Sequence, residues 1–365
     1  VITRPDQYVG VTTYAGDGTS VVVSDYQFKP DFVWIKGYTD PDKHGIYDTV
    51  RGATKRIQTG NQGTSAQDTV NGVMSFDRNG FSVGNYAETN GSGRGYVAWS
   101  WKAGGNKNTF NVDDVGYASA AAAGITGLDG TGEMTTAKFL GCSIGTKQGF
   151  SIIKYRGLGG GDVKVPHGLS QTPDMVIVKN LDETVDWAIT HSGLPGNRSL
   201  RFTTASTSTS GFLGLNKGGL ASTYFTINYT DTNLNYVNSS NDDFIAYLWH
   251  DVPGLQKFGS YEGNESTDGP YVELGFRPAI LLVKNADEAG NDWKIYDGTR
   301  NPHNVVTQVL YPNLSNGEDA NTGVDFLSNG FKWRDSGSSQ NGAETIIYAA
   351  WAEAPTFNLY GAQSN

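Results

Sequence analysis

Cysteine and long apolar runs are both scarce in this sequence, and each scarcity excludes a class of protein. A single cysteine, Cys142, among 365 residues rules out a framework of intrachain disulfides. The longest apolar stretches, residues 279–283 and 346–352, are far shorter than the roughly 20 residues that a transmembrane helix needs. We therefore expect no membrane insertion. The chain opens on neither an initiator methionine nor a secretory signal, so we expect a processed or truncated product.

Basic residues are also in deficit. The chain has 27 Lys and Arg against 37 Asp and Glu, which gives a formal charge of -10. This charge repels phosphate backbones and anionic lipid, so we expect no nucleic-acid partner. Charged residues make up only 18% of the chain and aromatic residues 12%, which is too apolar a balance for a disordered protein.

Glycine, in contrast, is abundant. The 48 glycines show no three-residue period, which excludes a collagen-like chain and indicates many turns. Such turn-dense chains are typically all-β. A length of 365 residues predicts about two or three domains.

Three marks recur in the same order and at similar spacing. Each copy has a Tyr-x-Gly sequence, then a strand-like run from Pro to Lys, then an apolar segment that closes on Trp101, Trp249 or Trp351. The distances from the proline to this tryptophan are 71, 76 and 73 residues. We therefore predict three homologous domains of about 100 residues each. Their expected boundaries are 1–106, 148–254 and 255–365, with a Gly/Ala-rich connector at 107–147 that carries two short strands of its own.

The repeated segments have the character of buried β-strands. The Pro-to-Lys runs and the closing segments are apolar on both faces, as in the inner strands of a sandwich or at a contact between domains. Asn79-Gly80 and Asn329-Gly330 fit tight hairpin turns with positive φ. The fold class predicted is all-β, with three tandem β-sandwich domains that are jelly-roll-like.

No catalytic, cofactor-binding or metal-binding residue stands out. A histidine built into the repeat should recur, but His44 aligns with Trp187 and Trp293, so that position favours a flat ring rather than a ligand. No polar constellation is expected in all three copies. We therefore predict a protein that is not an enzyme and has no cofactor and no metal. A glycosidase with two separated carboxylates stays open as an alternative, although nothing selects a pair.

One polar pattern occurs in two of the three copies. Asp48 precedes Arg51 by three residues, and Asp297 precedes Arg300 in the same way. Such a pair can close a turn through a charge-assisted hydrogen bond, and we predict this structural role. The alternative is a clamp for an anion or a sugar hydroxyl. Domain two has Thr190-His191 at this place, which makes a shared chemistry doubtful.

Four tyrosines in loops are candidates for contact with a ligand. Tyrosine combines an apolar ring with a polar hydroxyl, and so it suits stacking on sugars as well as packing. We predict possible glycan or partner contacts, with packing or an interface as the alternative. The candidates are Tyr38, Tyr86, Tyr229 and Tyr236.

The recurring residues resemble the tandem-repeat virion proteins of marine tailed bacteriophages, of the cyanophage type. The stretches that carry the resemblance include residues 28–36, 44–52, 79–84, 96–105, 149–155, 167–179, 257–263, 275–284, 326–332 and 349–353. The resemblance implies a virion structural protein on the tail or the capsid exterior, similar to a tail fibre or spike that attaches to host-surface glycan. It also implies other virion proteins as partners and a homo-oligomer, with a trimer possible. The alternatives are a capsid decoration or head-fibre protein and, less favoured, a polysaccharide depolymerase.

Overall fold

The structure is a computed structural model, and it describes residues 1–60, 67–68, 70–202, 214–215, 217–228, 234–320, 323–357 and 363–364. Within these residues the chain is almost wholly β, as the sequence predicted. The α-helices are single turns: α1 (Ala87–Asn90), α2 (Leu234–Val237) and α3 (Ser338–Asn341). Two short 3-10 helices, η1 (Pro5–Gln7) and η2 (Lys217–Gly219), complete the set in the described ranges. None of these helices is long and apolar enough to cross a membrane.

Domain one pairs a large sheet with a small one. The large sheet has the spatial order β1 (Val9–Ala15), β9 (Gly95–Trp101), β3 (Phe32–Gly37), β4 (Gly45–Asp48), β5 (Lys55–Gln58) and β6 (Gln67–Asp68). The small sheet has the order β2 (Val21–Val23), β8 (Gly80–Val83) and β7 (Val73–Asp77).

Domain three repeats this plan with fewer strands. Its large sheet has the order β19 (Gln256–Glu262), β25 (Thr345–Ala352), β21 (Pro278–Asn285) and β22 (Lys294–Asp297). Its small sheet has the order β20 (Tyr271–Glu273), β24 (Gly330–Trp333) and β23 (Val324–Leu327). A separate C-terminal hairpin pairs β26 (Thr356–Phe357) with β27 (Gln363–Ser364).

Domain two contains the same core of four strands, with three more at one edge. The core strands are β13 (Phe150–Arg156), β18 (Asp243–Trp249), β15 (Met175–Asn180) and β16 (Ala188–His191), and the small sheet is β14 (Val163–Pro166) with β17 (Tyr224–Ile227). The segment at 107–147 contributes β10 (Phe110–Val112), β11 (Val115–Tyr117) and β12 (Phe139–Gly145). These strands continue the large sheet beyond β13, so this segment is part of domain two rather than a connector with two strands of its own.

Both faces of each large sheet are buried, for two different reasons. In β9, Tyr96 and Ala98 pack toward the small sheet of domain one. Val97, Trp99 and Trp101 point to the opposite face and join a core that all three domains share. Because side chains alternate along a strand, one strand supplies both cores. This double burial explains the apolar runs seen in the sequence.

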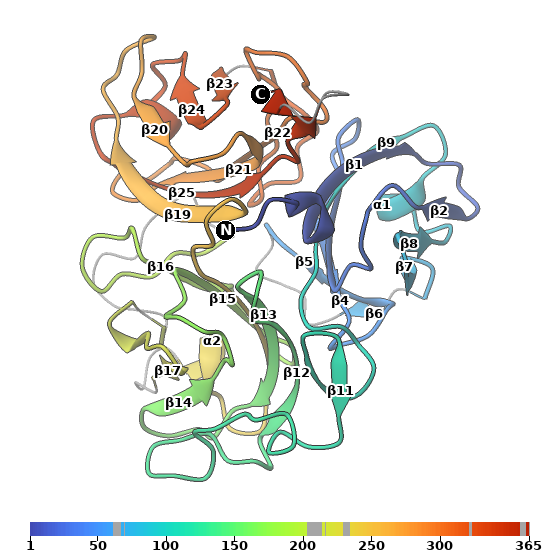
Figure 1. The fold of residues 1–365 in the computed structure, drawn as a ribbon, viewed down its shortest axis with the longest axis vertical. Helices are drawn as coiled ribbons and strands as arrows, with labels where there is room; N and C mark the ends of the chain where they lie inside the picture. The colour runs from blue at the N-terminus through green and yellow to red at the C-terminus, as the bar shows by residue number, and fades with distance from the viewer. Residues whose placement is uncertain are drawn as a thin grey trace.

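The shared core lies where the three domains meet. Figure 1 shows three lobes around a common centre, with the N-terminus close to it. The closing tryptophans of the three repeats touch one another, with ring centroids 5.1 Å apart for Trp101 and Trp351, 6.2 Å for Trp249 and Trp351, and 6.4 Å for Trp101 and Trp249. The chain is therefore a pseudo-threefold assembly formed by a single polypeptide.

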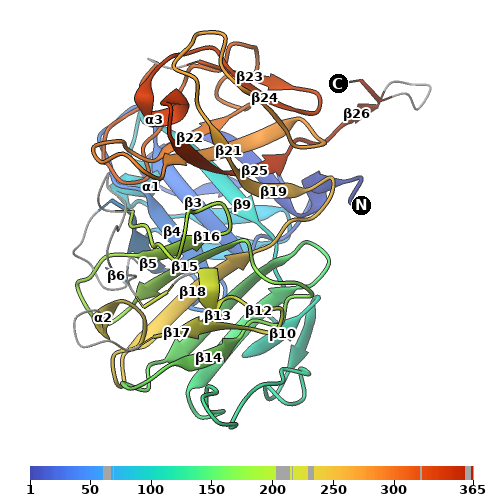
Figure 2. The same cartoon turned by 90° about the vertical axis from the view of Figure 1, so that its left-hand side faces the viewer.

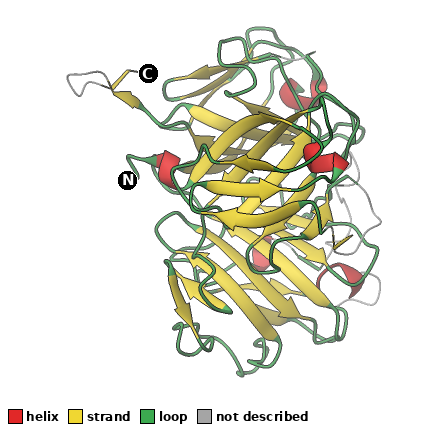
Figure 3. Cartoon of the chain, turned by 90° about the vertical axis from the view of Figure 1, so that its right-hand side faces the viewer, coloured by secondary structure: helices red, strands yellow, loops and turns green. Residues whose placement is uncertain are grey.

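The two ends of the molecule differ. Figures 2 and 3 show both termini at one end and the helices α1, α2 and α3 at the other. We call the latter the helical end. The strands β3, β15 and β21 run toward it, so the loops that follow these strands gather there.

The hairpins after Asn79 and Asn329 exist, but the reason for their glycines differs from the prediction. Neither Gly80 nor Gly330 has a positive φ. A Cβ atom on Gly80 would instead lie 1.7 Å from the carbonyl oxygen of Val23, and one on Gly330 would lie 2.1 Å from that of Val272. These glycines therefore permit the close approach of a neighbouring strand, and the expectation of a positive-φ turn was wrong.

Candidate interaction surface

The helical end is held to each large sheet by the Tyr-x-Gly repeat. The hydroxyl groups of Tyr14, Tyr155 and Tyr261 donate to the carbonyl oxygens of Thr89, Val237 and Gln340, at 2.7, 2.8 and 2.6 Å. These acceptors lie in the last turn of the three short helices. The glycine two residues later has no room for a Cβ atom, which at Gly157, for example, would lie 2.0 Å from the Ser239 carbonyl oxygen. The repeat thus fixes a loop against a helix end.

A buried lysine supports the next loop in every domain. Lys36, Lys179 and Lys284 are fully buried at the ends of β3, β15 and β21. Their ammonium groups donate to the carbonyl oxygen of the following residue, at 2.5, 2.8 and 2.6 Å. Burial lowers the pKa of each lysine to about 8. A polar constellation therefore does recur in all three copies, contrary to expectation, and its role is to anchor a loop.

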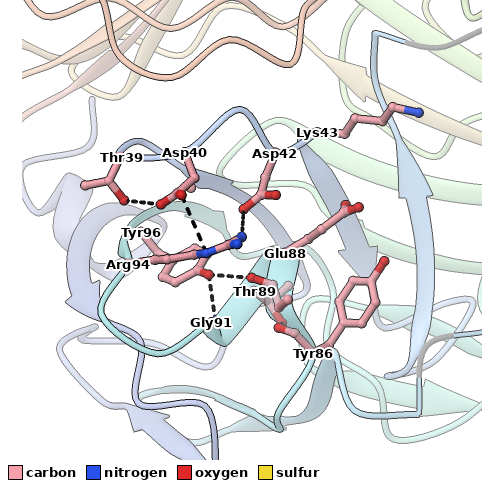
Figure 4. A network of polar contacts seen from close by, with 12 residues as sticks. Thr39, Asp40, Asp42, Lys43, Tyr86, Glu88, Thr89, Gly91, Arg94 and Tyr96 are labelled. Atoms are coloured by element: carbon pink, nitrogen blue, oxygen red, sulfur yellow. Dashed lines mark hydrogen bonds and ion pairs between the residues drawn. The ribbon is translucent and has the colours of Figure 1, made fainter.

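Domain one carries a distinctive polar network on this scaffold. Arg94 donates to Asp42 at 2.7 Å and lies 3.6 Å from Asp40. Thr39 donates to Asp40 at 2.7 Å and accepts the backbone N–H of Gly95 at 3.0 Å. Figure 4 shows these groups side by side above α1. The side chains of Arg94 and Asp40 are each about one-third exposed, at 33% and 32%, so the network is accessible to a ligand.

The network exists because domain one departs from the repeat. Counting back from the closing tryptophan, Arg94 takes the place of Asp242 in domain two and Glu344 in domain three. Those acids accept hydrogen bonds from Asn180, at 2.9 Å, and Asn285, at 3.3 Å. Domain one has Gly37 where the other two domains have this asparagine. Arg94, which is basic where the other domains have an acid, binds the carboxylates of its own loop instead. This reversal is the sequence signal that could have identified the site.

Tyr86 borders the network. Its hydroxyl accepts a hydrogen bond from Arg56 at 3.0 Å, and the Arg56 guanidinium carbon lies 5.3 Å from the ring centre. Arg56 also forms an ion pair with Glu88. Tyr86 is half-buried, and Figure 4 shows it extending to the same side as Lys43 and Glu88. The ring is therefore held in place with part of its surface accessible. Arg56, Glu88 and Arg94 were not predicted as site residues from the sequence.

Of the other candidate tyrosines, Tyr38 lies beside this network and Tyr236 lies in another domain. Tyr38 is half-buried and packs on Gly95, where a Cβ atom would lie 2.4 Å from its ring. Tyr236 lies in α2 of domain two, with the Arg201 guanidinium carbon 5.4 Å from its ring centre. Tyr229 lies outside the described residues.

The Asp-Arg turns lie between domains. The Asp48 carboxylate accepts from the backbone N–H of Arg51 at 2.8 Å and from its Nε at 2.5 Å, and Asp297 holds Arg300 in the same way, at 2.8 and 2.7 Å. Both ion pairs are almost fully buried. Asp48 also accepts a hydrogen bond from Tyr247 of domain two. The charged groups of the two Asp-Arg pairs are therefore not exposed to a soluble anion or sugar.

At the position shared by His44, Trp187 and Trp293, the two tryptophans also join domains. Trp187 donates its ring N–H to the carbonyl oxygen of Gln58 in domain one, at 3.0 Å, and Trp293 donates to that of Arg201 in domain two, at 2.7 Å. His44 stacks on Trp99, with ring centroids 6.2 Å apart, and receives the Trp34 ring N–H at 2.9 Å. A flat ring is what this position requires. Across the described part of the chain, no group of three or more His, Cys, Asp or Glu side chains is arranged to hold a metal ion.

A family model described as "Domain of unknown function (DUF7483)" matches residues 4–136 and 118–355. The chain belongs to the DUF7483 family. The two matched segments of this DUF7483 protein overlap at residues 118–136, between β11 and β12, in agreement with a chain built from repeated β domains. No curated protein and no solved structure matches the chain.

Proposed function

We propose that this DUF7483 protein is a structural component of a tailed-bacteriophage virion that attaches to host-surface glycan through the helical end of domain one. The observation that carries the proposal is the network around Arg94, which only domain one possesses among the three repeats. Domains two and three both keep the hydrogen bond between an acid and an asparagine at this place. The replacement of the acid by Arg94 in domain one is therefore local and leaves the scaffold intact.

The chemistry of this surface suits a sugar. Asp40 and Asp42 can accept hydrogen bonds from sugar hydroxyls, Lys43 and Arg94 can donate to them, and Tyr86 offers a ring for stacking. Because the groups are fixed by the buried Lys36 and by α1, binding would order few side chains and would cost little entropy. The overall charge of -10 favours a neutral glycan over an anionic one.

The virion setting agrees with the architecture. A rigid β-unit with a shared core and short helices is suited to a particle part that is present in many copies. The termini at one end leave the opposite, helical end free to meet a surface. A capsid decoration or head-fibre protein is the second candidate, and the open outer edge of β1 favours it because such an edge serves protein contacts.

The test is binding of purified host envelope polysaccharide, measured by isothermal titration calorimetry. We expect Tyr86→Ala and Asp42→Asn to weaken binding about tenfold or more, because stacking and charge-assisted hydrogen bonds are each worth about 1.4 kcal/mol or more. The matched control is Tyr271→Ala, which removes a 44% exposed tyrosine of domain three and should leave binding unchanged.

Three outcomes separate the candidates. Binding without release of sugar fragments supports attachment, whereas fragment release would identify a depolymerase. Absence of both would leave the decoration role, and electron microscopy of labelled particles would then locate the protein on the capsid or the tail.

A further inference from the structure

The first strand of each repeat has a different neighbour on its outer side. β1, β13 and β19 are equivalent, and each pairs with the closing strand of its own domain on the inner side. On the outer side, one edge is filled by a strand, one is closed by local contacts and one is open. An open edge presents unpaired backbone groups that can bind an added strand.

Domain two shows the filled edge. β12 pairs antiparallel with β13, with Ser143 opposite Ile152 and Gly145 opposite Phe150. A Cβ atom on Gly141 of β12 would lie 3.7 Å from Val50, in the Asp48–Arg51 turn of domain one. β12 therefore lies between the first strand of its own domain and the turn of the adjacent domain.

Domain three shows the closed edge. The outer backbone N–H of Phe258 donates to the Asp251 carboxylate at 2.7 Å, and Val252 forms a β-bridge with Gln256. The turn of domain two packs directly on this strand, because a Cβ atom on Gly193 would lie 2.8 Å from the Gly259 backbone. No space is left there for a further strand.

Domain one has the open edge. In domain two, β12 lies between β13 and Val50. The equivalents of β13 and Val50 for domain one are β1 and Thr299, so the space between β1 and Thr299 is where a strand equivalent to β12 would lie. This space is a cleft of about 210 Å³, whose lining includes Val9 and Val11 of β1, Gly298 and Thr299 of the turn, and the carboxylates Asp6 and Asp25. Within the described ranges, β9 is the only strand that pairs with β1. We call this space the edge cleft.

The backbone of β1 is oriented for pairing into the edge cleft. Lys102 donates to the Tyr8 carbonyl oxygen, and Gly16 donates to that of Arg94, so the even-numbered residues of this strand face β9. By the alternation of an antiparallel ladder, the N–H and C=O groups of Val9, Val11 and Thr13 face outward. The strand has no charged residue and no proline, the usual features that block an edge.

The C-terminal segment starts at the edge cleft. Glu353 and Ala354 line it, and the chain then leaves toward the hairpin of β26 and β27. Figures 2 and 3 show this hairpin standing away from the body. Residues 354–365 contain no charged side chain and include Phe357, Leu359 and Tyr360, a composition that suits a strand.

We propose that the edge cleft binds the C-terminal segment of a second copy of this chain, as a strand antiparallel to β1. The bound segment takes the place that β12 holds in domain two. Because each copy has one cleft and one segment at its rim, a reciprocal exchange closes a dimer. The described residues 354–357 lead away from their own body, which favours exchange over insertion into the cleft of the same chain.

Disulfide trapping tests which copy supplies the strand. Thr13→Cys is mixed with Phe357→Cys, Leu359→Cys or Gly361→Cys, three positions that cover the register, and is oxidised with copper phenanthroline. Thr13 is exposed, and the native Cys142 is buried, so only the new thiols can react. We expect a covalent dimer from at least one mixture and none when Val22→Cys, on an exposed part of the small sheet, replaces Thr13→Cys. A dimer absent from every mixture would overturn the proposal, as would a disulfide formed only within one chain of the corresponding double variants.

A second measurement does not depend on cysteine. Val11→Pro removes an outward N–H without breaking a bond to β9, whereas Val11→Thr keeps it. In sedimentation velocity, we expect the dimer dissociation constant of Val11→Pro to rise about tenfold or more, because a reciprocal dimer loses one hydrogen bond at each of its two clefts. Val11→Thr should match the unsubstituted chain. Equal self-association of Val11→Pro and the unsubstituted chain would contradict strand pairing at this edge, and a monomeric unsubstituted chain at high micromolar concentration would do the same.

Discussion

The hydroxyl group of Tyr247 in domain two donates a hydrogen bond of 2.7 Å to the Asp48 carboxylate in domain one. The equivalent contact joins domains three and one, where the Trp99 ring N–H donates to Asp297 at 3.2 Å. The third place in this cycle holds His191 of domain two, which contacts the Tyr348 carbonyl oxygen of domain three at 3.0 Å. The joint therefore exists three times, twice with an Asp-Arg turn and once with a histidine.

The exception in domain two follows from its partner. By register with the closing tryptophans, Tyr247 and Trp99 correspond to Ala349 in domain three. Alanine has no side-chain donor, so an aspartate facing it would be buried without that hydrogen bond. Histidine reaches the backbone instead. The loss of the Asp-Arg pattern, which the sequence left unexplained, is thus a change on both sides of one contact.

Removing the Tyr247 hydroxyl should weaken the joint between domains one and two. Tyr247→Phe keeps the ring but leaves the buried Asp48 carboxylate with one donor fewer, so we expect a loss of about 1–3 kcal/mol in the free energy of unfolding. Urea denaturation followed by tryptophan fluorescence measures it. The control Tyr271→Phe changes an exposed hydroxyl with a long contact of 3.4 Å and should stay within about 0.5 kcal/mol. Equal stability of the two variants would contradict the joint.

The sequence predicted the parts of the fold that depend on local pattern. The three closing tryptophans, the Pro-to-Lys strands and the apolar character of both faces were visible because strand alternation and repeat spacing are local properties. The role of the segment at 107–147 was not visible. Its strands add to β13 only after the chain has passed from domain one to domain two, and no repeat marks them.

Contacts between the three domains could not be predicted from the sequence for the same reason. Asp48 and Tyr247 are 199 residues apart, and spacing within the repeat gives no information about which domain follows which around the centre. The Arg94 network was in part readable. Aligned repeats show a basic residue opposite Asp242 and Glu344, but that comparison becomes informative only when the asparagine that follows the buried lysine is known to bind the residue at that position.

The buried lysines should make stability rise at mildly alkaline pH. Burial lowers the pKa of Lys284 to about 8, against about 10.4 in the unfolded chain, so between these values the unfolded chain binds more protons. The free energy of unfolding then increases with pH in this window. Lys284→Met removes that contribution. From pH 7.5 to 9.5, we therefore expect the free energy of unfolding of the unsubstituted chain to rise relative to that of the variant. The partly exposed Lys257→Met serves as control, and parallel curves for Lys284→Met would refute the explanation.

The histidine joint should be sensitive to acid. Nδ1 of His191 accepts the Gly193 backbone N–H at 3.0 Å, so its Nε2 carries the proton toward Tyr348. A proton on Nδ1 would face the Gly193 N–H, so two hydrogen-bond donors would point at each other. Burial accordingly lowers the pKa of His191 to about 4. In the unfolded chain this histidine has a pKa near 6.5, so it binds a proton at a higher pH than the folded histidine does. The free energy of unfolding therefore decreases as pH falls from about 6.5 to 4, by about 3 kcal/mol at pH 4.

His191→Asn tests this acid sensitivity, since its side-chain oxygen can replace Nδ1 without titrating. We expect urea midpoints of the variant to change less between pH 7 and 4.5 than those of the unsubstituted chain. His303→Asn, at an exposed position, should follow the unsubstituted chain. A slope unchanged by His191→Asn would assign the acid sensitivity to other groups.

The shared core should make the three domains unfold together. Trp101 contacts Trp249 and Trp351, so replacing it by alanine removes packing from all three repeats at once, at a cost of about 3–5 kcal/mol. We expect one thermal transition for the unsubstituted chain and one, at lower temperature, for Trp101→Ala. Hydrogen exchange should accelerate in β1, β13 and β19 alike. Val22→Ala, at a side chain that is 65% exposed, controls for the substitution itself. Faster exchange confined to domain one would show instead that the repeats are independent sandwiches that merely touch.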